Sequence, residues 1–109
     1  MISVIVLVPR LTNPTPPPSL LDETVTLTSD FYEKEYYLQL AKGDRLHVKV
    51  DSHGQPVDFE IIDPNGVISD KGEICIYEED WIVPVEGVYV FYVGAKTGTP
   101  KVRITVTKL

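Results

Sequence analysis

Apolar and polar residues alternate along most of this chain, in short runs separated by turn residues. The clearest run covers residues 45–51, where Leu46, Val48 and Val50 alternate with charged or polar side chains. A period of two places the apolar side chains on one face of a β-strand. The same reasoning predicts strands at 24–28, 36–40, 57–61, 74–77, 88–93 and 102–106. No run shows the period of an amphipathic helix.

Turn residues separate these runs at the spacing of a small β domain. Residues 41–44 read Ala-Lys-Gly-Asp, and residues 63–66 read Asp-Pro-Asn-Gly. Proline presets φ at the second position of a turn, and glycine accepts left-handed geometry. Together with an apolar segment at 2–8 the pattern gives eight strands, at intervals of about 8–12 residues. We therefore predict an all-β fold, an antiparallel, jelly-roll-like sandwich of about eight strands.

Two strands allow a prediction about register. We expect 45–51 and 57–61 to pair as a hairpin, with Val48 facing Phe59 on the inner side. On the outer side, Lys49 then faces Asp58 and His47 faces Glu60. Opposite charges placed across a strand pair contribute roughly 0.2–1 kcal/mol each. The nearly all-apolar run at 88–93 predicts a central strand buried on both faces.

The N-terminal segment differs from the rest of the chain. Residues 2–8 are apolar but too few to span a bilayer, and residues 9–20 contain five prolines, which favour an extended tether. We divide the chain into this strand and tether, residues 1–20, and a sandwich domain, residues 21–109. Val4, Val6 and Val8 are candidate partner contacts, because such a strand could pair with a sheet edge of its own domain or of a neighbour.

Charge and cysteine content limit the class of protein. The 109 residues carry a formal net charge of −6, so the chain lacks the basic footprint of a nucleic-acid binder. Cys75 is the single cysteine, which excludes an intrachain disulfide and slightly favours a reducing, cytoplasmic compartment. It lies in the apolar run 73–77, where we expect a buried or half-buried strand residue.

No motif for catalysis or metal binding is present in the sequence. His47 and His53 lack the partners of a zinc site, and residues 63–66 depart from a calcium loop because Gly66 stands at the fourth position rather than the sixth. Ser52 and His53 are adjacent, but a triad depends on geometry rather than adjacency. We predict no catalytic residue, no cofactor and no metal ligand. Loop carboxylates that converge on Ca²⁺ remain an alternative.

Aromatic residues are the remaining candidates for binding. Tyr37 and Tyr92 fall opposite the inward-facing sets of their strands, so we expect them to be exposed. Trp81 is expected in the core, but it is kept with the two tyrosines as a candidate partner contact. An exposed aromatic platform would also suit a carbohydrate.

Residues 36–106 carry motifs that resemble the GOLD (Golgi dynamics) domain. The matching positions are Leu40, Gly43, Asp44, Val57, Phe59, Ile61, Asp63, Pro64, Gly66, Trp81, Val83, Pro84, Glu86, Gly87, Tyr89, Phe91, Val102, Ile104 and Val106. The resemblance implies a β-sandwich and, for eukaryotic members, an adaptor or cargo-recognition role in membrane trafficking. This chain departs from those members because Tyr92 and Val93 stand where a Cys-Phe pair would follow, and because we find neither a coiled coil nor a transmembrane segment. The layout is also similar to the prepeptidase C-terminal domain. Neither resemblance implies a catalytic residue.

These observations favour a non-catalytic interaction module. We expect it to bind a protein partner, or to self-associate through strand pairing. The alternative is a carbohydrate- or calcium-binding module.

Overall fold

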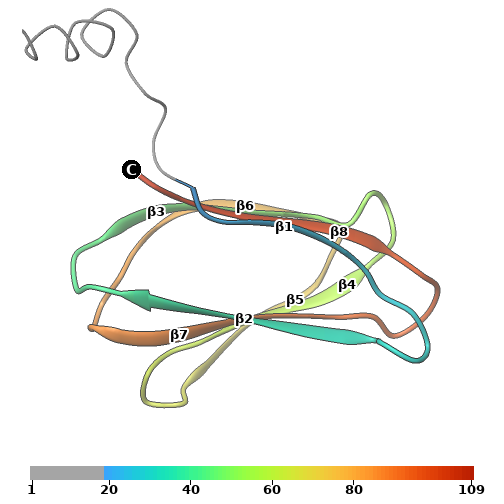
Figure 1. Ribbon diagram of the computed structural model, residues 1–109, viewed down its shortest axis with the longest axis horizontal. Helices are drawn as coiled ribbons and strands as arrows, with labels where there is room; N and C mark the ends of the chain where they lie inside the picture. Colours follow the sequence, from blue (N-terminus) through green and yellow to red (C-terminus); the bar gives the residue numbers. More distant parts are fainter. Residues whose placement is uncertain (1–18) are drawn as a thin grey trace, which may run out of the picture.

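The computed structural model describes residues 19–109, which form eight β-strands in two four-stranded antiparallel sheets. The sheets lie face to face (Figure 1), which confirms the predicted all-β sandwich. The upper sheet of Figure 1 has the order β1-β8-β3-β6, and the lower sheet has the order β2-β7-β4-β5. The strands are β1 (Ser19–Thr26), β2 (Glu33–Leu40), β3 (Arg45–Asp51), β4 (Val57–Ile62), β5 (Ile68–Ile74), β6 (Ile76–Ile82), β7 (Gly87–Gly94) and β8 (Lys101–Lys108).

The core lies between the sheets and is built from the alternating positions of the central strands. Strand β3 contributes Leu46, Val48 and Val50, all fully buried, and β8 contributes three more residues at the same spacing. The lower sheet contributes the buried aromatic residues of the core, from β2, β4 and β7. The buried apolar residues are Leu27, Tyr36, Leu40, Leu46, Val48, Val50, Val57, Phe59, Ile61, Val83, Tyr89, Phe91, Val93, Val102, Ile104 and Val106.

The predicted hairpin between 45–51 and 57–61 is wrong. Strand β3 lies between β8 and β6 in the upper sheet, whereas β4 lies between β7 and β5 in the lower sheet. Lys49 therefore faces Glu78 rather than Asp58. The sequence pattern does not distinguish a hairpin from two strands in facing sheets. In a hairpin the apolar side chains of both strands lie on the same side of one sheet, and in facing sheets they point toward each other, so each strand shows the same alternation.

Strand β5 was not predicted, and its neighbourhood corrects a second expectation. Residues 68–74 are mostly polar, because β5 is an edge strand with little buried surface. The predicted strand 74–77 is divided: β5 ends at Ile74, β6 begins at Ile76, and Cys75 lies exposed between them. Cys75 is thus neither buried nor half-buried. A bulge in β5 opposite Phe59 and Glu60 coincides with Gly72, whose φ is +78°.

Strand β7 is central in the lower sheet, as predicted, but it is not buried on both faces. Tyr89, Phe91 and Val93 point into the core, while Val88 on the other face is 46% exposed. Apolar residues on both sides of a strand predict that other parts of the protein cover both faces. None of the described residues covers the outer face of β7, so this prediction is wrong for that face.

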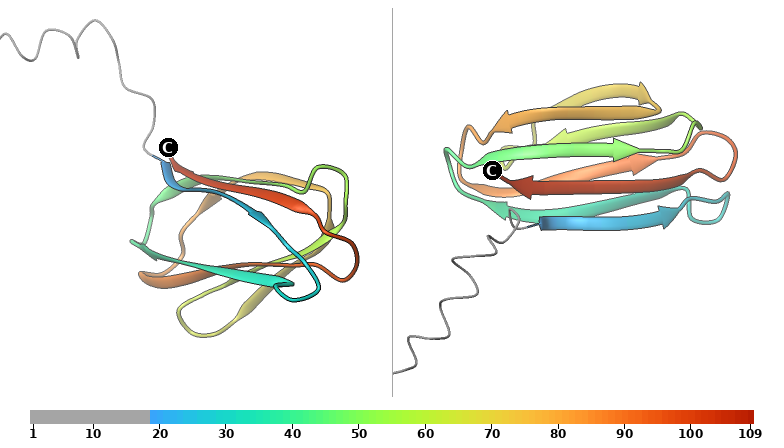
Figure 2. Two further views of the ribbon diagram at one scale, coloured as in Figure 1. Left: turned by 45° about the vertical axis from the view of Figure 1, so that its right-hand side comes forward. Right: turned by 90° about the horizontal axis from the view of Figure 1, so that it is seen from above.

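The two edge strands of the upper sheet are β1 and β6, as the view from above shows (Figure 2). Among residues 19–109 there is no helix of the length and apolarity needed to cross a bilayer. The predicted N-terminal strand, with Val4, Val6 and Val8, lies outside the described residues, so its pairing stays a prediction.

Candidate partner-binding face

The outer face of the lower sheet carries an apolar patch. Strand pairing places Tyr37 of β2 opposite Val90 of β7, and Val90 opposite Ile62 of β4. Ile62 in turn lies opposite Ile68 of β5, so four apolar side chains form one row across the whole sheet. Val88 extends this row along β7. Tyr37 is 63% exposed and Ile68 is 56% exposed. We call these five residues the apolar patch.

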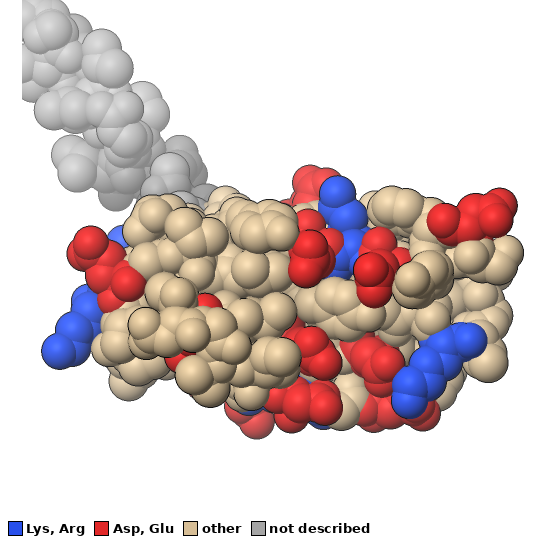
Figure 3. Space-filling model, turned by 90° about the horizontal axis from the view of Figure 1, so that it is seen from below, with Lys and Arg blue, Asp and Glu red and all other residues tan. Residues whose placement is uncertain are grey.

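An acidic band lies beside the apolar patch, further along the same strands. Glu35, Tyr92, Glu60 and Asp70 form the adjacent row across the four strands, and Glu33, Gly94, Asp58 and Glu73 form the row beyond it. We call the six carboxylates of these two rows the acidic band. Figure 3 shows the division of this face, with a tan half over one end of the strands and the acidic side chains over the middle and the other end.

The acidic band has little internal compensation. Lys96 lies 3.2 Å from Glu73 and 3.8 Å from Asp58. The other four carboxylates, of Glu33, Glu35, Glu60 and Asp70, form no salt bridge with any described residue. The hydrogen bond to Glu73 and the nearby charges of Asp58 and Glu73 raise the pKa of Lys96.

Both tyrosines of this face, the exposed Tyr37 and the half-buried Tyr92, donate hydrogen bonds to carboxylates. The Tyr37 hydroxyl donates to Glu35 at 3.0 Å, and that bond raises the pKa of Tyr37. The Tyr92 hydroxyl reaches across to β2 and donates to Glu33 at 3.0 Å, while its ring lies over Gly94. Partial burial, the bond to Glu33 and the charges of Asp58 and Glu60 together raise the pKa of Tyr92 to about 12. These hydroxyls stay protonated and do not neutralise the band.

Tyr37 and Tyr92 both lie on the outer face, as the sequence predicts, but only Tyr37 is exposed, because the Tyr92 ring packs over Gly94 and is half-buried. Trp81 is half-buried and points inward instead, with its ring edge-to-face against Tyr89 at 5.4 Å between centroids. Sequence reasoning missed Ile62, Ile68, Val88 and Val90. A signal was available, since Ile61 and Ile62 are both apolar and so break the alternation of β4.

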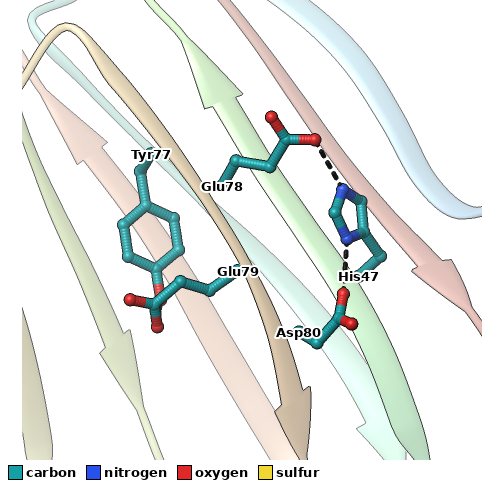
Figure 4. Close-up of polar contacts among 5 residues, drawn as sticks. All are labelled: His47, Tyr77, Glu78, Glu79 and Asp80. Atoms are coloured by element: carbon teal, nitrogen blue, oxygen red, sulfur yellow. Dashed lines mark hydrogen bonds and ion pairs between the residues drawn. The ribbon is translucent and has the colours of Figure 1, made fainter.

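The outer face of the upper sheet holds a second cluster of titratable groups. His47 of β3 lies between two carboxylates of β6, with Nε2 at 2.8 Å from Glu78 and Nδ1 at 2.6 Å from Asp80 (Figure 4). The predicted partner Glu60 is wrong, because β4 belongs to the other sheet. Hydrogen bonds to Asp80 and then Glu78 raise the pKa of His47. Tyr77 and Glu79 lie on the opposite side of β6 and bond to each other at 3.1 Å.

The remaining polar candidates have structural partners. The buried Ser52 hydroxyl donates to the Cys75 carbonyl, whereas the His53 ring bonds to the Lys101 carbonyl, so the two side chains do not form a nucleophile–base pair. Four carboxylates in or next to turns accept hydrogen bonds from backbone amides: Asp44 from Ala41, Asp51 from His53, Asp63 from Asn65 and Val67, and Asp70 from Gly72. Asp51 and Asp70 belong to strands β3 and β5. In the described part of the chain, no three His, Cys, Asp or Glu side chains are placed so that they could hold one metal ion.

Comparisons with known proteins concern the fold. No protein-family model matches the chain, and no curated protein matches it in sequence. Its structure is similar to that of Aeromonas hydrophila PliG, a periplasmic lysozyme inhibitor of g-type lysozyme, with a TM-score of 0.64 and 15% identity over 85% of this chain and 88% of that one. It is also similar to the pre-peptidase C-terminal domain of a collagenase from Bacillus anthracis, with a TM-score of 0.68 and 13% identity over 87% of this chain and 100% of that one.

The second neighbour agrees with the resemblance to the prepeptidase C-terminal domain, whereas the GOLD resemblance stays a prediction. At such low identity the likeness concerns architecture, and the chain shares an all-β sandwich with both proteins.

Proposed function

We propose that this chain is a non-catalytic β-sandwich module that binds a protein partner through the outer face of its lower sheet. The observation that carries the proposal is the apolar patch. Its residues come from all four strands and include Tyr37, Ile68 and Val88, each between 46% and 63% exposed. Contiguous exposed apolar surface with a polar rim is typical of protein-binding sites on soluble proteins.

The position of the patch supports the proposal. Ile62 and Val90 stand on the inner strands β4 and β7, whose other sides carry Phe59 and Phe91 of the core. A face anchored in this way keeps its shape in the free protein, so little ordering entropy is lost when a partner binds.

The structural neighbours add modest support. One of them, PliG, is described as a lysozyme inhibitor, which is a protein that acts by binding another protein. The polar side chains around Ser52 and His53 lack the mutual geometry that an acyl-transfer site needs, which supports a binding role over a catalytic one.

A capture experiment with matched variants tests the proposal. The patch variant is Ile68→Ser/Val88→Ser, and the control is Ile76→Ser/Ile82→Ser, whose residues are 64% and 62% exposed on β6 of the upper sheet. The three immobilised proteins are exposed to extract of cells that produce the chain, and retained proteins are identified by quantitative mass spectrometry. We expect a protein that wild type and control retain and the patch variant loses. Equal retention by all three would refute the proposal.

Self-association by strand pairing is the second route by which the module could act. The alternation of Val4, Val6 and Val8 in the sequence motivates it. Deleting residues 1–18 and measuring the mass by light scattering tests this route. A mass that falls to that of one chain on deletion supports it, and an oligomer of unchanged subunit number refutes it.

A further inference from the structure

The apolar row and the adjacent acidic row have a defined orientation relative to the strands of the lower sheet. The apolar row and the first acidic row both cross the four strands, and they lie two residues apart along each strand. Two residues of a strand span about 7 Å, and four strands span about 14 Å from first to last. The outer face of the lower sheet therefore carries two parallel rows, one apolar and one mainly acidic, and each row is perpendicular to the strands.

The acidic band carries negative charge that salt bridges among the described residues offset only in part. Lys96 neutralises part of the row farther from the apolar patch, at Glu73 and Asp58. The carboxylates of the row next to the patch, Glu35, Glu60 and Asp70, form no salt bridge with any described residue. Like charges on adjacent strands cost free energy. A partner that places positive charges next to the acidic band removes this repulsion and is also attracted by the carboxylates.

We infer that the partner recognised by this face is a basic amphipathic segment, which lies across the strands with apolar side chains on the apolar patch and Lys or Arg side chains along the acidic band. This inference rests on the proposed function. Charge complementarity favours a basic partner: a second copy of this chain stacked over the full face would place its acidic band against either the first acidic band or the apolar patch, and neither contact supplies positive charge. A helix of about 14 residues covers about 20 Å, enough to cross the four strands.

The hydroxyls of Tyr37 and Tyr92 fit the same partner. Each donates to a carboxylate of the band, to Glu35 and Glu33 respectively, which fixes the carboxylate while leaving its negative charge intact. Glu60 has no such donor among the described side chains. Carboxylates held in place lose less entropy when they pair with a cation than carboxylates on mobile side chains.

Two synthetic helical peptides of about 14 residues serve as probes. Both carry leucine along one stripe; one carries lysine along one flank, and the other carries glutamate there. Binding to the whole chain is measured by fluorescence anisotropy at low salt. We expect the lysine peptide to bind at least about tenfold more tightly than the glutamate peptide, and its affinity to fall as salt is added.

Variants locate the attraction. Glu35→Gln/Glu60→Gln removes two charges of the acidic band, and the control Glu23→Gln/Glu78→Gln removes two charges from the upper sheet. We expect the first pair to weaken lysine-peptide binding about threefold to tenfold, the scale of two exposed ion pairs, and the control to leave it within about twofold. Equal weakening by both pairs, or no binding of the lysine peptide at about 1 mM, would overturn the inference.

The apolar variant Ile68→Ser/Val88→Ser separates this inference from the proposed function. If it weakens binding of the peptide while Glu35→Gln/Glu60→Gln does not, the face binds but the basic chemistry is wrong. If neither variant changes peptide binding, and the capture experiment finds no partner that depends on the patch, the proposed function fails as well.

Discussion

Both outer faces of this sandwich carry charged side chains, but their arrangement differs between the two faces. On the upper sheet, Arg103 bonds to Asp22 through two hydrogen bonds of 3.0 Å, and His47 lies between Glu78 and Asp80. Each of these basic groups thus pairs with carboxylates on a neighbouring strand, β8 with β1 and β3 with β6. On the lower sheet, carboxylates occupy one half and apolar side chains occupy the other (Figure 3).

This contrast makes the lower face the place to test for partner binding. Paired charges on the upper face are satisfied within the folded chain and need no partner. The lower face leaves apolar surface in water and like charges side by side, and each of these costs free energy unless something binds there. The proposed binding of a basic, amphipathic partner would offset both costs.

The largest expected effect comes from the core that both faces share. Phe91 is fully buried on β7, directly behind the apolar patch. Phe91→Ala should lower the free energy of unfolding by about 3–5 kcal/mol, because it removes a large buried ring and leaves a cavity. Urea unfolding measures this, with Val88→Ala on the same strand as the control, which we expect to change stability by less than about 0.5 kcal/mol. Similar losses for both would mean that Val88 is not exposed.

A smaller effect should be confined to the lower sheet. Gly87 has a φ of +144°, and a Cβ there would come within 2.6 Å of the Pro64 ring. Gly87→Ala should therefore cost about 1–3 kcal/mol, through backbone strain and displacement of the turn after β4. We expect amide NMR shifts to change along β4, β5 and β7 and to stay nearly constant in β1 and β8. Equal changes in both sheets would contradict this separation of the faces.

Charge removal should have opposite signs on the two faces. Glu35→Gln/Glu60→Gln should raise the free energy of unfolding by about 0.5 kcal/mol at low salt, because Glu60 lies opposite Asp70 across β4 and β5 and Glu35 lies in the same acidic row. Asp22→Asn should lower it, because Arg103 loses its ionic partner. Thermal unfolding at low and high salt measures both, and salt should shrink both changes. Destabilisation by both variants would mean that the acidic band is compensated in the free protein.

Much of the fold could be predicted from the sequence, since alternation identifies strands and their inward sides. The run 45–51 coincides with β3, and the turn at 63–66 forms with Gly66 donating its amide to the Asp63 carbonyl. Strand partners could not be predicted, because Val48 is buried equally well beside β4 or facing it. Of the candidate face, only Tyr37 and Tyr92 were predicted, because the apolar side chains of 88–93 were assigned to a covered strand.

The smallest expected effect uses pH to test the pairing on the upper face. Hydrogen bonds to Asp80 and Glu78 raise the pKa of His47 above its ordinary value of 6.5, so the folded state holds the proton more tightly than the unfolded chain does. The stabilisation from this proton is fully present below about pH 6.5 and is lost as pH rises through the folded pKa. His47→Gln lacks that proton, so wild type should lose stability relative to this variant as pH rises above about 6.5 and through the folded pKa. Urea unfolding at several pH values measures the difference, and NMR titration of the His47 ring measures the pKa directly. A His47 pKa at or below the ordinary value would show that Glu78 and Asp80 do not hold the ring in solution, and the contrast between a paired and an unpaired face would lose its clearest example.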